Sequence, residues 1–296
     1  MGILSAYLMR TILIGTALVL AVLLALTTLF VFIGELDNTM GDYGVPQALL
    51  FSIVRLPQFS FEMLPLATLI GALLGLGGLA GNSELVVMRS AGLSVGRLAG
   101  MVAMTGIVLM VVAALVGEYI GPPLDYFARN MRNEMRFQHA EQNSGNPAWV
   151  KDGPVILHLE RVNSEFEFGG IYLFRFDDDH SLRSIARAEN SGIDDEDKWI
   201  LENFRETRFR DDGVQVVESS LAVETFDLSG DLLGITLVKP VSLSARGLWN
   251  YIRYLKRNSL SAGRYETELW SRLSTTVTIV IMPVLALAFV FGPLRA

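Results

Sequence analysis

The chain carries the stretch Gly71-Ala-Leu-Leu-Gly-Leu-Gly-Gly-Leu-Ala-Gly-Asn-Ser-Glu-Leu-Val-Val-Met-Arg-Ser-Ala-Gly92. An uncharged, glycine-rich apolar run ends at Asn82-Ser83, and a segment of about two helical turns follows. That segment begins with Glu84, holds four consecutive apolar residues and ends at Gly92. A helix this short is marginal alone in water, and its four apolar residues span too much of its circumference to be covered by one neighbour. We therefore interpret it as a docking element at a membrane surface.

The composition indicates a membrane protein with one water-soluble insertion. The 296 residues are 51% hydrophobic and 19% charged, with a mean hydropathy of +0.40, whereas soluble domains are about 25% charged. Residues 119–262 hold 23 of the 31 acids and 17 of the 24 bases. The net charge of −7 argues against nucleic acid as a partner, and the absence of cysteine excludes disulfides and cysteine-ligated zinc.

Four uncharged runs are long enough to cross a bilayer as helices, which takes about 20 apolar residues. They cover residues 12–33, 63–81, 98–117 and 273–294. In the second run Gly71 and Gly75 put small residues at four-residue spacing, which lets helices approach closely in lipid. Basic residues flank the runs at positions 10, 89, 97 and 295, whereas the loop between the first two runs is acidic, with Arg55 against Glu35, Asp37 and Asp42. The positive-inside rule then places the N-terminus, the loop 82–97 and the C-terminus in the cytoplasm, and residues 119–262 outside.

The outside segment reads as a β domain. A helix over 125–136 is followed by strand patterns at 155–159, 171–176, 182–190, 198–210 and 214–226, separated by turn clusters rich in aspartate. This spacing is typical of a β-sandwich or open barrel. Residues 244–258 return to helical spacing, with Leu248, Ile252 and Leu255 on one face of an interfacial helix. The expected domains are 1–118 (three spans, with the short helix at about 83–92), 119–262 (β domain with flanking helices) and 263–296 (fourth span).

Enzyme motifs in the chain lack the context that catalysis requires. Gly92-Leu-Ser-Val-Gly96 has the pattern of a hydrolase nucleophile elbow around Ser94, but it sits between two membrane spans, across the membrane from every histidine. Gly75-x-Gly77-x-x-Ala80 fits a dinucleotide fingerprint only formally, because it lies inside a span. No ATP-binding P-loop motif occurs, and the histidines show no metal-ligand spacing. The sequence predicts no catalytic residue, cofactor or metal.

Two groups of residues are candidates for binding. In the short helix, Asn82 or Ser83 is the expected N-cap, Glu84 suits the positive N-terminal end, and Gly92 is the expected terminator. Its docking set comprises Ser83, Glu84, Leu85, Val86, Met88 and Arg89. The helix either inserts into a groove on another protein or rests on lipid, and we favour insertion.

The second group is Arg129, Arg132 and Arg136, which share one helical face just outside the membrane. Such a face suits phosphate groups, although pairing with Glu134 and the domain's other acids remains open. Glu62 and Glu118 border the second and third spans near their outer ends, where solvation explains them.

Several segments together resemble the permease family of the lipopolysaccharide exporter, the LptF/LptG type, and are most similar to its LptG-type subunit. They are Ser83–Gly92, Gly117-Glu118, Ala128-Arg129-Asn130, Trp149-Val-Lys-Asp152, Tyr251–Lys256, Ala262-Gly-Arg-Tyr265 and Phe291-Gly-Pro-Leu-Arg295. The resemblance implies an α-helical membrane protein with an inserted, jellyroll-like, all-β periplasmic domain. It also implies six spans where this chain has four, so we expect a C-terminal truncation.

The resemblance further implies a function and a set of partners. The chain would be a non-catalytic ABC-transporter subunit in the bacterial inner membrane that extracts lipopolysaccharide and passes it to a periplasmic bridge. Its partners would be an LptF-type paralogue, a cytoplasmic ATPase dimer docked on the 83–92 helix, and a single-span LptC-type periplasmic protein. The alternatives are a membrane-anchored periplasmic scaffold or receptor whose β domain binds a partner, and a membrane hydrolase using Ser94.

Overall fold

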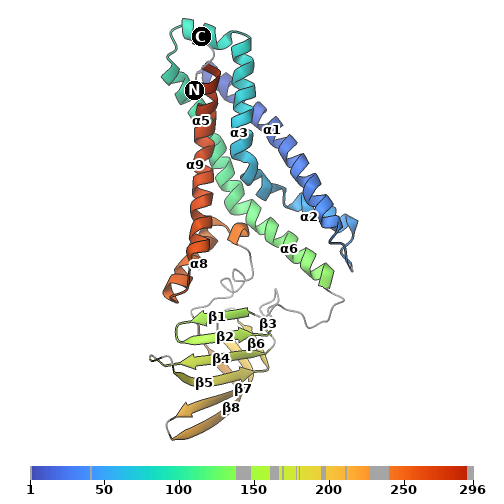
Figure 1. Ribbon diagram of the computed structural model, residues 1–296, viewed down its shortest axis with the longest axis vertical. Helices are drawn as coiled ribbons and strands as arrows, with labels where there is room; N and C mark the ends of the chain where they lie inside the picture. Colours follow the sequence, from blue (N-terminus) through green and yellow to red (C-terminus); the bar gives the residue numbers. More distant parts are fainter. Residues whose placement is uncertain are drawn as a thin grey trace. The chain divides into compact units, whose positions relative to one another are not determined.

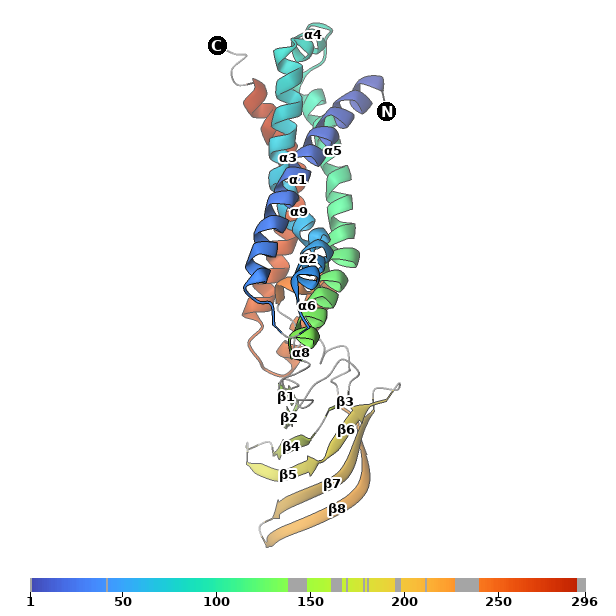
Figure 2. The same cartoon turned by 90° about the vertical axis from the view of Figure 1, so that its right-hand side faces the viewer.

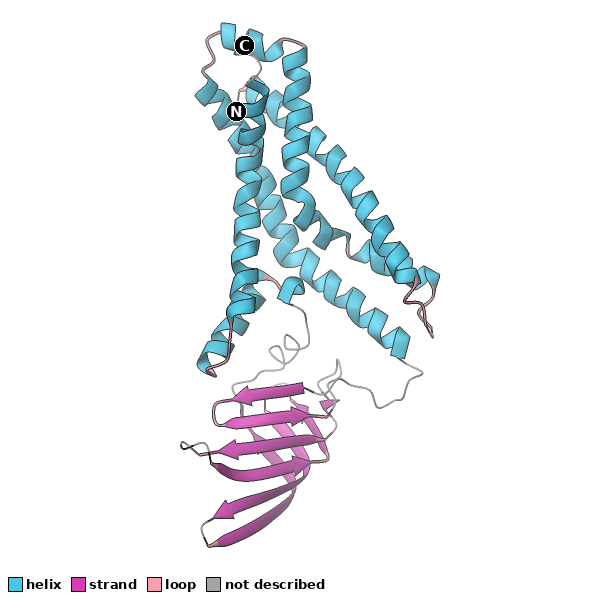
Figure 3. Cartoon of the chain, viewed as in Figure 1, coloured by secondary structure: helices cyan, strands magenta, loops and turns pink. Residues whose placement is uncertain are grey.

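A computed structural model describes residues 2–40, 42–137, 148–160, 167–168, 170–177, 179, 181–194, 198–210, 212–226 and 240–291. The chain forms two compact units (Figure 1). One comprises Met1–Arg136, Ser244–Arg246 and Thr267–Ala296, and the other comprises Phe137–Leu243 and Gly247–Glu266. The first unit is helical, and the second contains every strand of the described residues (Figure 3).

The helical unit contains the four predicted spans. Its elements are α1 (Ile3–Leu36), α2 (Val45–Val54), α3 (Leu56–Gly81), α4 (Glu84–Ser90), α5 (Val95–Leu115), the π-helical turn η1 (Val116–Ile120), α6 (Gly121–Phe137) and α9 (Gly263–Phe291). The candidate membrane helices are α1, α3, the continuous helix Val95–Asn133 and α9. Each begins or ends several residues beyond its apolar run, because a helix continues through polar residues once it leaves the apolar layer. The predicted membrane class is therefore confirmed.

A glycine contact sets the distance between α1 and α3. A Cβ atom placed on Gly71 of α3 would overlap the backbone of Gly15 and Thr16 on α1, and one on Gly15 would overlap the carbonyl of Gly71. A Cβ on Gly75 would lie 3.2 Å from Thr11. Small residues at four-residue spacing thus bring the two backbones together, as the sequence predicted.

The short helix α2 was not foreseen. Its Ala48 and Phe51 are buried with Tyr43, Ala128 and Met131 in one apolar cluster. This packing holds α2 against the middle of α6, although its ten residues are too few to span a bilayer.

The second unit confirms the predicted β domain as an antiparallel sheet. Its strands are β1 (Ala148–Asp152), β2 (Val155–Leu159), β3 (Glu167–Phe168), β4 (Ile171–Phe176), β5 (Leu182–Ala188), β6 (Asn190–Ile193), β7 (Trp199–Arg210) and β8 (Gly213–Glu224). The order is β1-β2-β4-β5-β7-β6-β3, and β8 pairs with the other edge of β7. The turn η2 (Pro240–Ser242) and the helix α8 (Ala245–Arg257) follow, as the helical spacing at 244–258 indicated.

The sheet curls at a pair of facing irregularities. β5 and β6 both pair with β7 and are separated by Glu189, while Asn203 opposite has φ +51 and donates a hydrogen bond to Glu189 at 2.9 Å. Along β7 the buried side chains change from odd to even positions at Asn203: Trp199 and Leu201 are buried before it, and Phe204 and Glu206 after it. A bulge inverts the pleat in this way and bends the strand. β7 and β8 accordingly curve along their length (Figure 2).

The concave face of the curled sheet carries a buried ion cluster. Arg175 on β4 contacts Glu206 on β7 at 2.5 Å and Glu224 on β8 at 2.6 Å, although three strand spacings separate β4 from β8. Glu206 also accepts hydrogen bonds from Ser184 at 2.7 Å and from Arg208 at 2.7 and 2.9 Å. Burial alone would raise the pKa of Glu206, but the bonds from Arg208 and Ser184 and the charges of the two arginines lower it overall.

Gly71→Val should lower the free energy of unfolding by about 2 kcal/mol. The new side chain would overlap the backbone of α1, which cannot move aside by changing rotamer as a side chain could. The control is Gly77→Val, since no atom lies within 4 Å of a Cβ at that position. Thermal unfolding of the detergent-solubilised chain measures both. Equal destabilisation by the two variants would contradict the α1–α3 contact.

Glu206→Gln should destabilise the β unit by about 2 kcal/mol at pH 7, because it removes the charge that four donors surround. The pKa of Glu206 is lowered in the folded state, so its stabilising effect is complete above the unfolded pKa of about 4.3 and is lost as pH falls through the folded value. In urea unfolding, the stability difference between the two proteins should therefore shrink as pH falls below about 4.3. Glu218→Gln, in an exposed pair with Arg205, should change little at either pH.

Candidate functional site

The docking helix α4 ends in a complete glycine cap. Gly92 has φ +90, its amide donates to the carbonyl of Arg89 at 3.0 Å, and the amide of Leu93 donates to Met88 at 3.3 Å. This is the Schellman arrangement, which favours glycine at the left-handed position. The predicted terminator is thus confirmed. The predicted side-chain cap by Ser83 is wrong, because Ser83 has φ +62 and its hydroxyl makes no capping hydrogen bond.

The apolar residues of α4 divide between two surroundings. Leu85 is fully buried and Met88 is 8% exposed, both in a cluster with residues of α1, α3, α5 and α9. Val86 and Val87 are 47% and 64% exposed. Leu85 and Met88 therefore anchor the helix to its own bundle, whereas Val86 and Val87 present the apolar surface. Val87 was absent from the predicted docking set, since the sequence did not show which side of the helix the bundle covers.

Both charged residues of α4 contact other helices of the unit. The Tyr7 hydroxyl on α1 donates to a carboxylate oxygen of Glu84 at 2.9 Å. The guanidinium of Arg89 lies 5.7 Å from the ring centre of Phe291 on α9, a cation–π distance. The two ends of α4 thus contact the first and the fourth of the described spans.

A buried aspartate holds two arginines at the other end of the unit. Asp125 on α6 is fully buried and accepts hydrogen bonds from Arg55 at 2.6 Å and Arg129 at 2.7 Å. The Arg55 guanidinium also lies 5.1 Å from the ring centre of Phe51 and 4.8 Å from that of Phe59. The four-residue spacing of Asp125 and Arg129 was visible in the sequence, but Arg55 was not foreseen because it is 70 residues away.

The neighbouring arginine on α6 pairs with the end of α1. Arg132 donates to Glu35 at 2.9 Å, and the Tyr43 hydroxyl donates to the other oxygen of Glu35 at 3.3 Å. Among the described residues, then, the α6 arginines do pair with acids, but with Asp125 and Glu35. The side chains of Arg136 and of Glu134, the partner considered from sequence, lie outside the described residues. Among the ion pairs of the described residues, three arginines here share two carboxylates.

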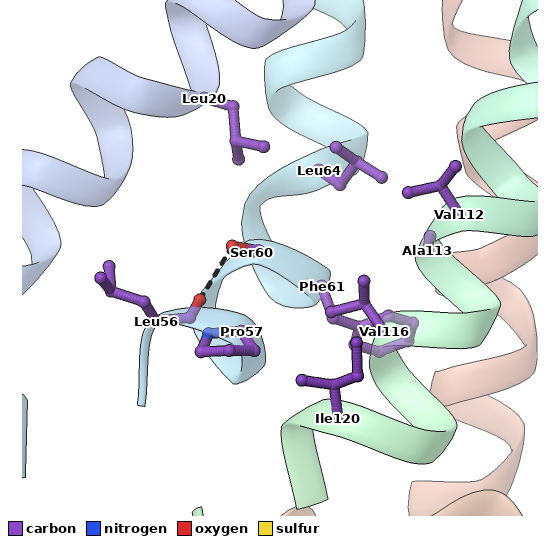
Figure 4. A pocket seen from close by; sticks show the side chains of 10 residues that line it. All are labelled: Leu20, Leu56, Pro57, Ser60, Phe61, Leu64, Val112, Ala113, Val116 and Ile120. Carbon is purple, nitrogen blue, oxygen red and sulfur yellow. Dashed lines mark hydrogen bonds between the residues drawn. The ribbon is translucent and has the colours of Figure 1, made fainter. Parts of the chain in front are cut away.

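An apolar pocket of about 350 Å³ lies in the same unit (Figure 4). Its walls come from α1, α3, α5 and η1, and the lining residues are Leu20, Leu56, Pro57, Ser60, Phe61, Leu64, Val112, Ala113, Val116 and Ile120. The hydroxyl of Ser60 donates to the carbonyl of Leu56 at 2.8 Å, so the polar group of the lining is already satisfied. Such a pocket suits a hydrocarbon chain.

The turn η1 joins three parts of the helical unit. Arg272 of α9 is 6% exposed and donates to the Gly117 carbonyl at 3.0 Å. Glu118 accepts the amides of Ala245 and Arg246, at the start of α8, at 2.7 and 3.0 Å. Solvation as the explanation for Glu118 is thus wrong: the carboxylate caps a helix distant in sequence.

The enzyme motif around Ser94 has a structural explanation. The Ser94 hydroxyl accepts the amide of Arg97 at 3.3 Å and so caps the N-terminus of α5. His158 lies on β2 in the other unit, and His139 and His180 lie outside the described residues. Within the described part of the chain, no group of three His, Cys, Asp or Glu residues is placed to hold a metal ion.

Comparison with known proteins matches the chain from end to end. The family model for the lipopolysaccharide export system permease LptF/LptG covers residues 6–296. The chain is 33% identical over 299 aligned positions to LptG of Escherichia coli, covering all of this chain and 83% of that protein. It is 31% identical to LptG of Haemophilus influenzae, over 99% of the chain and 82% of that protein. The similarity to LptF of E. coli is 24%, over 89% of the chain and 72% of the relative.

Glu118→Ala should free two amides of α8 and weaken its first turn by about 1 kcal/mol, the usual effect of losing an N-cap. Hydrogen exchange measured by mass spectrometry should show faster exchange in peptides covering residues 245–248. Glu62→Ala is the matched control, because Glu62 accepts a hydrogen bond from the Gln58 side chain and caps no helix. Unchanged exchange in Glu118→Ala would contradict the capping role.

Proposed function

The chain belongs to the LptF/LptG family of lipopolysaccharide export system permeases, and on that premise we propose that it works as the LptG-type permease subunit of an ABC transporter. Its higher identity to LptG than to LptF favours the LptG type. The subunit extracts lipopolysaccharide from the inner membrane and passes it to a periplasmic bridge. The full-length family match is the observation that carries this conclusion.

The helical unit has the chemistry to hold an anionic glycolipid. The apolar pocket accepts part of an acyl chain, and its wall residues Leu56 and Pro57 directly follow Arg55. The cluster of Arg55, Arg129 and Arg132 offers guanidinium groups, which suit phosphate oxygens. Arg136 follows on α6 as the fourth candidate contact. An incoming phosphate must compete with Asp125 and Glu35 for these cations.

The subunit is non-catalytic and depends on an external motor. Its LptF/LptG relatives are permeases, and a separate cytoplasmic ATPase dimer supplies the energy. We place the N-terminus, α4 and the C-terminus in the cytoplasm and the domain 119–262 in the periplasm. An LptF-type paralogue completes the pore, and a single-span LptC-type protein joins the periplasmic side.

The proposed mechanism is a shift between two states of the helical unit. Nucleotide-driven closure of the ATPase moves the exposed face of α4, formed by Val86 and Val87. Glu84 passes the movement to Tyr7 on α1, whose last turn carries Glu35, the partner of Arg132. A motor that favours one arrangement of α1 thereby changes the affinity of the arginine cluster for lipid phosphate.

Glu84→Ala should weaken assembly with the ATPase about tenfold or uncouple ATP hydrolysis from lipopolysaccharide release, because the carboxylate that ties α4 to α1 is lost. Tyr7→Phe separates two roles of Glu84: it removes the α1 contact but keeps the charge. A coupling defect in both variants identifies Glu84 as a link to α1, and a defect in Glu84→Ala alone identifies it as a contact to the motor. Ser90→Ala, exposed on the same helix, is the control. Normal assembly and transport by Glu84→Ala would sink the proposed role.

Charge reversal at Arg129 and Arg132 together should reduce photo-crosslinking to lipopolysaccharide about tenfold, because two phosphate partners become repulsive. The matched control reverses Arg253 and Arg257, which are exposed on α8. A melting curve for each variant separates loss of binding from loss of fold. Crosslinking at the wild-type level in the Arg129 and Arg132 variant would leave these arginines with a structural role only.

A further inference from the structure

A row of aromatic and basic side chains crosses the convex face of the β unit. Trp149 on β1 pairs in register with His158 on β2, His158 with Tyr172 on β4, and Tyr172 with Arg187 on β5. These strands are consecutive neighbours in the sheet (Figure 1). The Arg175–Glu224 contact bridges the curl of the sheet and so marks its concave face. Residues of the Trp149 row alternate along their strands with Val150, Leu157 and Leu173, which are buried on that concave face, so the row lies on the opposite face. The row therefore faces outward.

The indole ring of Trp149 contacts two aromatic neighbours on the same face of the sheet. Its centre lies 4.4 Å from that of His158 and 5.9 Å from that of Phe174, with which it is stacked at 25°. The residue nevertheless remains 62% exposed. A large aromatic ring that contacts its neighbours and is still mostly exposed loses little rotamer freedom on binding.

The far end of the row is positively charged. The Arg187 guanidinium lies 5.3 Å from the ring centre of Tyr172, and its side chain is 54% exposed. Its nearest carboxylate is that of Glu160 at 3.8 Å, too long for a hydrogen bond. Three strand spacings of about 4.8 Å separate Trp149 from Arg187. The platform is thus about 14 Å long, with neighbouring rings tilted by 44° to each other, aromatic at one end and cationic at the other.

We propose that this platform, formed by Trp149, His158, Tyr172 and Arg187, binds the oligosaccharide part of an anionic glycolipid. The C–H bonds on the flat side of a pyranose ring are weakly positive, and the face of an aromatic ring is negative, so the two stack. Arg187 then receives a phosphate or carboxylate carried by the sugar chain. This inference rests on the proposed function, because a lipopolysaccharide cargo brings an anionic saccharide to the protein.

The chemistry of the platform favours a glycan over an acyl chain or a second protein. An acyl chain needs an enclosed apolar groove, whereas this surface is open and includes His158 and Arg187. A protein partner would bury the row beneath a water-excluding rim. A saccharide uses flat rings and a guanidinium while remaining partly in water.

The test measures binding of deacylated, phosphorylated lipopolysaccharide core oligosaccharide to the full chain in nanodiscs, by saturation-transfer NMR. Trp149→Ala should weaken binding about tenfold, and Trp149→Tyr should restore most of it because a ring is retained. Arg187→Gln should weaken binding of the phosphorylated oligosaccharide and leave binding of the dephosphorylated form unchanged. Trp249→Ala is the control, since Trp249 is 55% exposed on α8 and lies outside the row. Melting curves show whether each variant is folded.

Equal oligosaccharide affinity for folded Trp149→Ala and the wild type overturns the inference. The inference is also overturned if the wild type does not bind the oligosaccharide. The same holds if, in that case, an added protein partner covers Trp149 and shields it from iodide quenching. In both cases crosslinking of complete lipopolysaccharide to the helical unit tells whether the proposed function stands without the platform. Binding of lipid A that lacks core sugars, abolished by Trp149→Ala, would identify an acyl-chain site and also overturn it.

Discussion

The contact between Gly15 on α1 and Gly71 on α3 is the constraint on which the helical unit depends. With no side chain between the two backbones, α1 is fixed to α3 at this point. At one end of α1, Tyr7 bonds Glu84 of the docking helix, and at the other end Glu35 bonds Arg132 of the arginine cluster. About 42 Å of continuous helix separates Tyr7 from Glu35. One rigid element thus joins the two candidate sites, and the glycine contact is where it can pivot.

The charges of the unit follow from the cost of placing them in lipid. They gather at the helix ends, and each one described in detail has a partner: Asp125 for Arg55 and Arg129, Glu35 for Arg132, and the carbonyl of Gly117 for Arg272. Pairing with carboxylates lowers the energetic cost of these arginines when no ligand is bound. The same pairing limits the affinity of the arginines for a phosphate ligand. A phosphate gains only the difference between its own attraction and that of the carboxylate it displaces. In the proposed mechanism, small movements of α1, which carries Glu35, would therefore change the affinity for such a phosphate.

The sequence predicted those features that depend on neighbouring residues. Long uncharged runs predicted the spans, period-two patterns predicted the strands, and Gly92 predicted the end of α4. The missed features depend on contacts between distant residues. Nothing near Glu118 indicates that it caps a helix more than 120 residues later, and nothing in the apolar run of α4 shows that Leu85 faces the bundle while Val87 faces outward. The pleat inversion at Asn203 likewise involves a contact with Glu189, which lies between β5 and β6.

The central claim is that the exposed side of α4 receives force from a cytoplasmic ATPase. The most direct test is crosslinking to the purified ATPase dimer after reconstitution, because the chain has no cysteine and a single introduced thiol is unambiguous. Val87→Cys should crosslink to the ATPase, more strongly when nucleotide closes the dimer, whereas Leu85→Cys, buried in the bundle, should not. Failure of Val87→Cys to crosslink in an assembled complex, or equal crosslinking at both positions, would contradict the account.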